Sequence, residues 1–420
     1  MRVLVVGGGA REHALCWRLA RSSQVERVLA APGNAGLASV ATPVAVAAGD
    51  APGLIELARR ERVELVVVGP EAPLVAGVAD RLREAGLAVL GPSAAAARIE
   101  GSKAWAMDLC HRHGIPAPRS ERAPDLSAAL ALAAEWPLPA VIKADGLMAG
   151  KGVLIAPTRA QALDATRQLA AHGPVVFEEF LEGAELSGFA LCDGRRALAL
   201  GCARDHKRLG AGNTGPMTGG MGAYAPVAGL GEGTAAAVRD ILQGAVDAMA
   251  AEGCPFTGFL FAGLMLTPAG PRVLEFNCRL GDPEAQALLP LWAGDPVPLW
   301  QRAAAGALAP DDRVVMEAGA ALGVVLASPG YPAAPEPGQE IWGLDAGGQP
   351  AAGGALCFHA ATVQDGAAWR TAGGRVLTLV GRAADLEGAR TAAYAAVASV
   401  GFDGAQWRSD MGRAEGTRGR

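Results

Sequence analysis

Apolar and polar positions alternate in blocks along the first hundred residues, and the blocks have two different periods. Uninterrupted apolar runs predict four buried strands, at residues 2–9 (where the run ends in glycines), 28–31, 65–68 and 88–90. Three segments between them carry apolar side chains at helical spacing: 10–21, 54–60 and 78–85. Strands that alternate with helices are typical of a doubly wound parallel sheet. We therefore predict an α/β fold with such a domain at residues 1–101.

The first strand ends in three glycines, Gly7, Gly8 and Gly9, directly before the first predicted helix. Backbone N–H groups at such a turn suit a phosphate or a carboxylate. The dinucleotide-binding fingerprint is incomplete, because Glu12 stands where the third glycine belongs and no acidic residue follows the second strand. The pattern predicts an anion site for a phosphorylated ligand other than NAD.

A glycine-rich connection joins two apolar strands, 140–143 and 153–156. It follows Lys143 and contains Gly146, Gly150, Lys151 and Gly152. A P-loop would lead into a helix and carry Ser or Thr after its lysine. We interpret this connection instead as a hairpin that closes over nucleotide phosphates.

A further apolar strand, 175–177, leads into an extended segment with acids on both sides. The segment contains Glu178, Glu179, Phe180 and Leu181, and Glu185 follows shortly after it. Free backbone groups beside carboxylates suit the edge of an adenine ring and ribose hydroxyls. The segment is a candidate nucleotide site.

Residues 205–224 contain six glycines, a proline and two threonines after Asp205, His206, Lys207 and Arg208. We expect no packed helix or strand here. A long ordered loop of this composition is usually functional. Its N–H groups can surround an anion, and His206 is either a general base or a phosphate-positioning group.

The segment 273–286 carries polar residues at alternate positions of an otherwise apolar strand. Side chains alternate across a strand, so Glu275 and Asn277 share one face about 7 Å apart, and Arg279 follows on that face. A carboxylate and a carboxamide are oxygen ligands that suit Mg²⁺, which relies on substrate phosphates for part of its shell. We predict a metal site here, beside a cation for an anionic group.

From residue 321 to 420 the pattern becomes that of hairpins. Three strands are expected, at 322–327, 355–361 and 374–379, and then a helix at 386–400. We find no catalytic cluster in this part of the sequence. We predict a β-rich domain that closes over the site formed by residues 102–320.

Bulk composition excludes several classes of protein. A hydrophobic content of 51% with 19% charged residues describes a globular chain, and a net charge of −5 gives no reason to expect nucleic acid or an anionic membrane as partner. Seven cysteines without a C-x-x-C pair fit a reduced cytoplasmic protein. No signal peptide or membrane segment is expected.

Taken together, the motifs resemble the ATP-grasp superfamily and, within it, the glycinamide ribonucleotide synthetase family, over essentially the whole chain. The matching motifs are GGGAREHA (7–14), APGNAG (31–36), VGPEAPL (68–74), EGSKA (100–104), IKADGLMAGKGV (142–153), EEFLEG (178–183), DHKR (205–208), TGPMTGGMGAY (214–224), EFNCRLGDPE (275–284) and HAAT (359–362). The sequence departs from the family at Gly8, Ala184, Asn213 and Met217.

The resemblance implies ATP-dependent ligation of glycine to 5-phosphoribosylamine through glycyl phosphate, in purine biosynthesis. It also implies an ATP-grasp domain at 102–320 with a lid at about 117–183. ATP would be bound by Lys103, Lys143, Gly150, Lys151, Gly152, Glu178, Glu179, Phe180, Leu181 and Glu185. The substrates would be bound by Gly7, Gly8, Gly9, Asp205, His206, Lys207, Thr214, Gly215, Gly219, Gly220 and Arg279. Glu275 and Asn277 would hold Mg²⁺ or Mn²⁺, and Arg279, Lys151 and His206 would be catalytic.

Three alternatives remain at this point. Another ATP-grasp enzyme, such as a carboxylase, would hydrolyse ATP with bicarbonate and without glycine. A silent nucleotide-binding module would release no ADP with any substrate. A dehydrogenase is disfavoured by the incomplete fingerprint. A monomer is expected.

Overall fold

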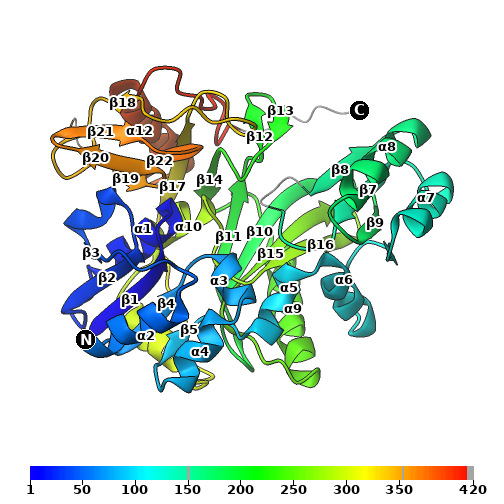
Figure 1. Ribbon diagram of the computed structural model, residues 1–420, viewed down its shortest axis with the longest axis horizontal. Coiled ribbons are helices and arrows are strands. Elements are labelled where there is room, and N and C mark those ends of the chain that lie inside the picture. Colours follow the sequence, from blue (N-terminus) through cyan, green and yellow to red (C-terminus); the bar gives the residue numbers. More distant parts are fainter. Residues whose placement is uncertain (149–151, 352–353, 414–420) are drawn as a thin grey trace.

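The computed structural model describes residues 1–148, 152–351 and 354–413, and its N-terminal part forms the predicted parallel sheet (Figure 1). The strand order is β3-β2-β1-β4-β5, with every neighbouring pair parallel. The strands are β1 (Arg2–Gly7), β2 (Arg27–Pro32), β3 (Thr42–Pro43), β4 (Leu65–Val68) and β5 (Val89–Leu90). The helices are α1 (Ala10–Leu19), η1 (Ala35–Ser39), α2 (Ala51–Arg60), α3 (Glu71–Val75), α4 (Val78–Glu84) and α5 (Ala94–Gly101). All four residues of β4 are buried, as expected for a strand covered on both faces.

A second, eight-stranded sheet crosses the middle of the molecule and continues into the C-terminal part. Its order is β16-β15-β10-β11-β14-β17-β22-β19. The strands are β10 (Ala184–Asp193), β11 (Ala197–Asp205), β14 (Gly222–Ala225), β15 (Thr257–Thr267), β16 (Gly270–Asn277), β17 (Ala320–Ala327), β19 (Leu356–His359) and β22 (Arg375–Ala383). Because β14 pairs with β17, residues on either side of position 320 belong to one hydrogen-bonded sheet.

Helices cover this central sheet and connect its strands. They are α6 (Lys103–Arg112), α9 (Glu232–Ala251), α10 (Glu284–Leu288), η2 (Leu289–Leu291), α11 (Val297–Ala304) and, at the C-terminal end, α12 (Leu386–Ser399). The long helix α9 packs on β10, β11 and β16. A three-stranded sheet, β18 (Glu340–Ile341), β21 (Ala368–Thr371) and β20 (Thr362–Asp365), completes the β-rich C-terminal part.

A small antiparallel sheet with two helices forms a separate lobe at the far end of the molecule in Figure 1. Its strands, in the order β6-β9-β7-β8, are β6 (Ser120–Ala123), β9 (Val175–Glu179), β7 (Ala140–Ala144) and β8 (Val153–Ala156). Its helices are α7 (Leu126–Glu135) and α8 (Arg159–Ala170). This lobe has a hydrophobic core of its own, centred on Phe177 and Ile142.

The predicted three-part α/β architecture is confirmed, with local differences. Strands β10 and β11 have no counterpart in the prediction, because their small residues dilute the apolar pattern. The segment 205–224 was expected to contain no strand. It holds a short hairpin of β12 (Arg208–Gly210) and β13 (Thr214–Met217), followed by the buried strand β14.

Two further observations concern the broad class of the protein. None of the helices among the described residues is long and apolar enough to cross a membrane. All seven cysteines lie within the described residues, and each is a free thiol.

Candidate functional site

A cleft of about 550 Å³ lies between the N-terminal sheet, the lobe and the central sheet. It brings together most of the residues that the sequence singles out. The predicted site residues that line it are Lys103, Lys143, Gly152, Glu178, Glu179, Phe180, Leu181, Glu185, Asp205, Lys207, Gly219, Glu275, Asn277 and Arg279. Met217, one of the departures from the family pattern, also lines it.

Other predicted residues lie elsewhere. Gly150 and Lys151 are outside the described residues. The residues that do not line the cleft are Gly7, Gly8, Gly9, His206, Thr214, Gly215 and Gly220. Thr214 and Gly215 lie in the exposed strand β13, whereas His206 is buried and packs its ring near Tyr224.

Lys207 links two acids at the centre of the cleft. Its Nζ lies 3.3 Å from Glu185 Oε2 and 3.6 Å from Glu275 Oε1. Burial opposes the charge of Lys207, but Glu185, Asp205 and Glu275 raise its pKa well above the usual value. Burial likewise opposes ionisation of Glu275, yet Lys207, Lys143 and Lys103 hold the pKa of its carboxyl below the usual value. Glu275 is therefore an anion surrounded by cations.

Asn277 is the last residue of β16, and Arg279 follows just beyond the end of the strand. Arg279 donates from Nε to Glu71 Oε2 at 3.0 Å, and from Nη2 to Glu100 Oε1 at 2.9 Å and to Asn277 Oδ1 at 3.1 Å. Burial disfavours its charge, but Glu100 and Glu71 raise the pKa of Arg279. The predicted cation thus lies between carboxylates from α3 and α5.

The donor set fits a hard divalent cation that is shared with a substrate. Within the described ranges no cluster of three or more His, Cys, Asp or Glu residues is placed to hold a metal. Glu275 and Asn277 offer only two oxygen ligands, and the Asn277 amide nitrogen is buried without a hydrogen-bond partner. Mg²⁺ commonly uses one or two carboxylates and completes its shell with waters and substrate phosphates. The site therefore suits a metal that arrives with a nucleotide.

Lys143 and Lys103 approach the cleft from the lobe and from α6. Lys143 Nζ lies 2.7 Å from Glu178 Oε2 and donates to the Leu274 carbonyl at 2.8 Å. Lys103 Nζ donates to the Gly146 carbonyl at 2.6 Å, and burial lowers its pKa. Both lysines are held by fixed partners near Glu275, so their charge is positioned before any anion binds.

The segment after β9 forms an open edge beside these lysines. Glu179 is the last residue of β9, and its backbone N–H donates to the Arg119 carbonyl. Phe180 and Leu181 follow outside the strand and line the cleft. Backbone groups beyond the end of a ladder can pair with the edge of a flat heterocycle, and the adenine role of this segment stays a prediction.

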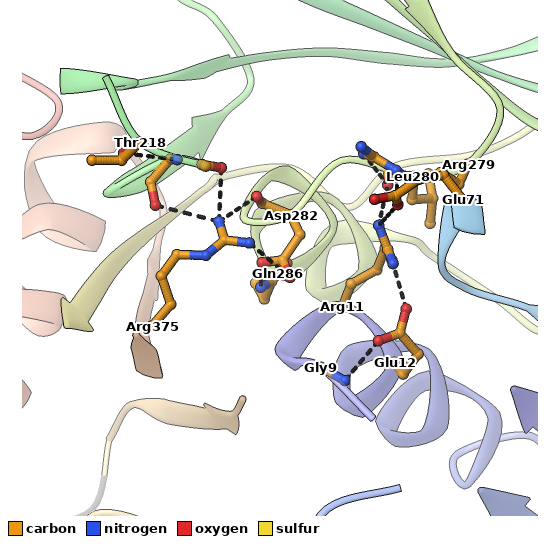
Figure 2. A network of polar contacts seen from close by, with 12 residues as sticks. Gly9, Arg11, Glu12, Glu71, Thr218, Arg279, Leu280, Asp282, Gln286 and Arg375 are labelled. Carbon is orange, nitrogen blue, oxygen red and sulfur yellow. Dashed lines mark hydrogen bonds and ion pairs between the residues drawn. The ribbon is translucent and has the colours of Figure 1, made fainter. Parts of the chain in front are cut away.

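The glycine turn after β1 is close to the site but differently arranged from the prediction. The Gly9 N–H donates to Glu12 Oε2 at 2.7 Å, and Arg11 Nε donates to Glu12 Oε1 at 2.6 Å (Figure 2). A Cβ on Gly8 would lie 2.4 Å from the Gly33 carbonyl oxygen, so only glycine fits there. Glu12, at the position of the missing third glycine, thus occupies the N–H group expected for an anion.

The charged and polar cleft residues that were assigned no role from sequence include Arg11, Glu71, Glu100, Asp282, Glu284, Tyr331 and Arg375. Glu284 lies in the motif that follows Arg279. It could have been singled out from the sequence as an acid at the start of a helix. Nothing in the sequence singles out Arg375, because its strand was interpreted as part of a domain without a catalytic cluster. Arg375 and Tyr331 of the C-terminal part both line the cleft, as expected for a domain that closes over the site.

Glu284 is a buried acid whose protonation should control stability. Its Oε1 accepts a hydrogen bond from Ser187 at 3.1 Å, and burial together with Asp205 raises its pKa from the ordinary 4.5 to about 7. The folded state therefore binds the proton more tightly, and stability is lost as pH rises from about 4.5 through 7. One pKa unit corresponds to about 1.4 kcal/mol, so the full effect is about 3 kcal/mol.

We expect Glu284→Gln to raise the thermal midpoint at pH 8 relative to the parent chain and to change it little at pH 5. Scanning calorimetry at both pH values measures this, with Glu317→Gln at the surface as the control. An equal shift at the two pH values would contradict the assignment of the proton to Glu284.

Models of the phosphoribosylglycinamide synthetase family match three consecutive parts of the chain. The N domain matches residues 1–100, the ATP-grasp (A) domain residues 101–285 and the C domain residues 321–414.

Proteins named phosphoribosylamine–glycine ligase are similar over almost the whole chain. The one from Xanthomonas axonopodis pv. citri is 46% identical over 98% of this chain and 97% of its own. The one from Allochromatium vinosum is 46% identical over 98% of both. The crystal structure of that enzyme from Thermotoga maritima has a TM-score of 0.86 at 34% identity, over 98% of this chain and 100% of its own.

More distant structures share the fold alone. The biotin carboxylase domain of the Hydrogenobacter thermophilus 2-oxoglutarate carboxylase has a TM-score of 0.71 at 17% identity, over 97% of this chain and 91% of its own. Coverage is similar, but the sequence identities of 34% and 46% to the ligases are at least twice the 17% to this carboxylase domain. The chain therefore belongs to the phosphoribosylglycinamide synthetase family and is an ATP-dependent ligase of the ATP-grasp type.

Proposed function

We propose that this chain ligates glycine to 5-phosphoribosylamine in two chemical steps within the cleft, giving glycinamide ribonucleotide, ADP and phosphate. The observation that carries the proposal is the convergence of Lys103, Lys143 and Lys207 on Glu275. Phosphoryl and acyl transfer require charge neutralisation and positioning more than covalent chemistry. This arrangement supplies both.

In the first step the glycine carboxylate attacks the γ-phosphorus of ATP, forming glycyl phosphate and releasing ADP. Lys103 and Lys143 hold the phosphates, together with Lys151 in the glycine-rich hairpin. The segment Glu178–Leu181 receives the adenine ring and Glu185 the ribose. Glu275 and Asn277 would hold Mg²⁺ or Mn²⁺, which supplies charge neutralisation between phosphate oxygens.

In the second step the amine of phosphoribosylamine attacks the acyl carbon; the C–N bond forms, the C–O bond to phosphate breaks, and phosphate leaves with the proton that the amine loses. Arg279 stabilises the acyl phosphate or the glycine carboxylate. The segment 205–222 and the turn Gly7–Gly9 bind phosphoribosylamine, the turn through groups other than the Gly9 N–H, which Glu12 holds. His206 would position the phosphate of phosphoribosylamine or act as a base. Because His206 is buried, we favour the first role, with His206 positioning the backbone that contacts the phosphate.

The domain limits follow from the same interpretation. We propose domains at 1–101, 102–320 and 321–420, with the lid at about 117–183 in the middle one. We also propose that the protein is cytoplasmic, which its free thiols support. We further propose that it is a monomer. Sedimentation analysis tests the monomer.

Substrate omission tests the reaction. ADP release is measured with Mg-ATP, glycine and freshly prepared phosphoribosylamine, each left out in turn. We expect glycinamide ribonucleotide only when all three are present. ADP release that depends on bicarbonate and not on glycine would instead support the carboxylase alternative.

Lys151 lies outside the described residues, and its assignment rests on sequence. We expect Lys151→Ala to raise KM for ATP or to lower kcat, because the hairpin loses the cation that closes over the phosphates. Steady-state kinetics with varied ATP measures this, with Arg167→Ala on the outer face of α8 as control. Unchanged kinetics would contradict the role of the hairpin.

A further inference from the structure

Arg375, in strand β22, extends from the C-terminal part into the cleft and contacts two separate segments of the middle domain (Figure 2). Its Nη1 donates to the Gly219 carbonyl at 2.7 Å and to the Asp282 carbonyl at 2.6 Å. Its Nη2 lies 3.3 Å from Asp282 Oδ2. The Arg375 guanidinium thus links the end of the segment 205–222 to the turn that contains Asp282.

The fastened turn also lies against the N-terminal part. A Cβ built on Gly9 would lie 3.6 Å from Asp282 Oδ2, so this carboxylate lies beside the glycine turn. Burial disfavours its charge, but Arg375 and Arg11 keep the pKa of Asp282 below the usual value. Gln286 Nε2 donates to its other oxygen at 2.7 Å. The three matched domains therefore meet at Asp282.

The hydrogen bonds continue from Gly220 through Thr218 to the backbone carbonyl of Lys207, whose side chain is held separately by Glu185 and Glu275. Gly220 N–H donates to Thr218 Oγ1 at 3.0 Å, and Thr218 donates from both its N–H and its hydroxyl to the Lys207 carbonyl. Gly220 has φ +113, and a Cβ there would lie 2.5 Å from Pro283 Cδ, so the two backbones approach closely. Tyr331, also from the C-terminal part, accepts a hydrogen bond from the Gly219 N–H.

We infer that Arg375 is a positioning residue for phosphoribosylamine, which sets the separation between the segment 205–222, the Asp282 turn and Gly9. The inference rests on the proposed binding of phosphoribosylamine by the segment 205–222 and the glycine turn. Arg375 acts through carbonyl groups and a carboxylate, and its planar fork with several donors is needed for that. Among the described residues, Arg375 makes its hydrogen bonds and ion pair with Gly219, Gly220 and Asp282 and none with the lobe or β16, so the ATP half of the cleft should be unaffected.

The test compares Arg375→Ala and Arg375→Lys with Arg382→Ala. Arg382 is in the same strand but exposed, and its side chain pairs with Glu317. Loss of hydrogen bonds to a charged group should raise KM for phosphoribosylamine, and Kd for glycinamide ribonucleotide by calorimetry, about 10- to 100-fold in Arg375→Ala. The lysine variant should be intermediate and Arg382→Ala unchanged.

A second readout separates positioning from a general structural effect. Glycyl phosphate made from ATP and glycine alone is trapped with hydroxylamine, and its rate should stay at the parent level in Arg375→Ala. Equal loss of both half-reactions, or no change in KM for phosphoribosylamine, would overturn the inference. Should Arg375→Ala not fold, Asp282→Asn gives the same test with a smaller expected effect. Failure of the proposed function itself would appear in the parent chain, as ADP release without dependence on glycine.

Discussion

Glu275→Ala should lower the ligation rate by about three orders of magnitude while leaving the fold intact. The variant removes the carboxylate from the predicted metal pair and leaves three lysines without their shared anion. The fold should persist because Lys207 keeps its contact with Glu185. Ligation rate and circular dichroism measure the two parts of this expectation.

Metal binding gives an independent readout for the same residue. Binding of Mn²⁺ in the presence of ADP, followed by electron paramagnetic resonance, should weaken in Glu275→Ala and in the isosteric Glu275→Gln. Glu340→Ala is the matched control, because Glu340 pairs with Arg370 at the surface. Near-normal turnover of Glu275→Ala would remove Glu275 from the metal site.

Lys143→Met should lower both stability and activity, and the stability loss should be unusually large. Lys143 and Glu178 are almost fully buried, and one carboxylate oxygen of Glu178 has no hydrogen-bond partner besides. Removing the lysine leaves a buried charge uncompensated, which costs about 3–5 kcal/mol. Scanning calorimetry measures the loss, and KM for ATP measures the effect on phosphate binding.

A double variant distinguishes the two effects. Lys143→Met combined with Glu178→Leu should recover most of the stability, because a buried ion pair can be replaced by apolar groups, but none of the activity. Arg167→Ala breaks an exposed ion pair with Asp164 in the same lobe and should be nearly neutral. A single variant as stable as the control would show that the charge of Glu178 is not carried in the folded state.

The fold was predictable wherever a strand has an uninterrupted apolar run. Strand β4, with four buried apolar residues, is such a case. Strand β10 is buried from Leu186 to Asp193 but contains Ser187, Gly188 and Cys192, so its apolar pattern is interrupted. Small residues can be buried in a sheet without leaving a hydrophobic signal in the sequence.

The site was predictable where residues close together in the sequence lie on the same face of one strand. Glu275 and Asn277 share a strand face, and both line the cleft. The pairing of Arg279 with Glu71 and Glu100 was not predictable, because these partners lie 208 and 179 positions away in the chain. The role of Arg375 depends on a contact with Asp282, 93 positions away. Such contacts are set by the tertiary fold alone.

The pairing of β14 with β17 bears on how enzymes of this kind can exchange parts. A recombinant chain cut at position 320 would leave β14 with an unpaired edge, and exposed edges of this kind promote aggregation. One hydrophobic core runs from Leu4 to Met411 across all three matched domains, whereas the lobe around Phe177 has its own. The domains that the sequence family defines are therefore not the parts that can be exchanged between proteins. Of the described parts, the lobe is the one suited to transfer into another protein. The C-terminal part has to be transferred together with β14.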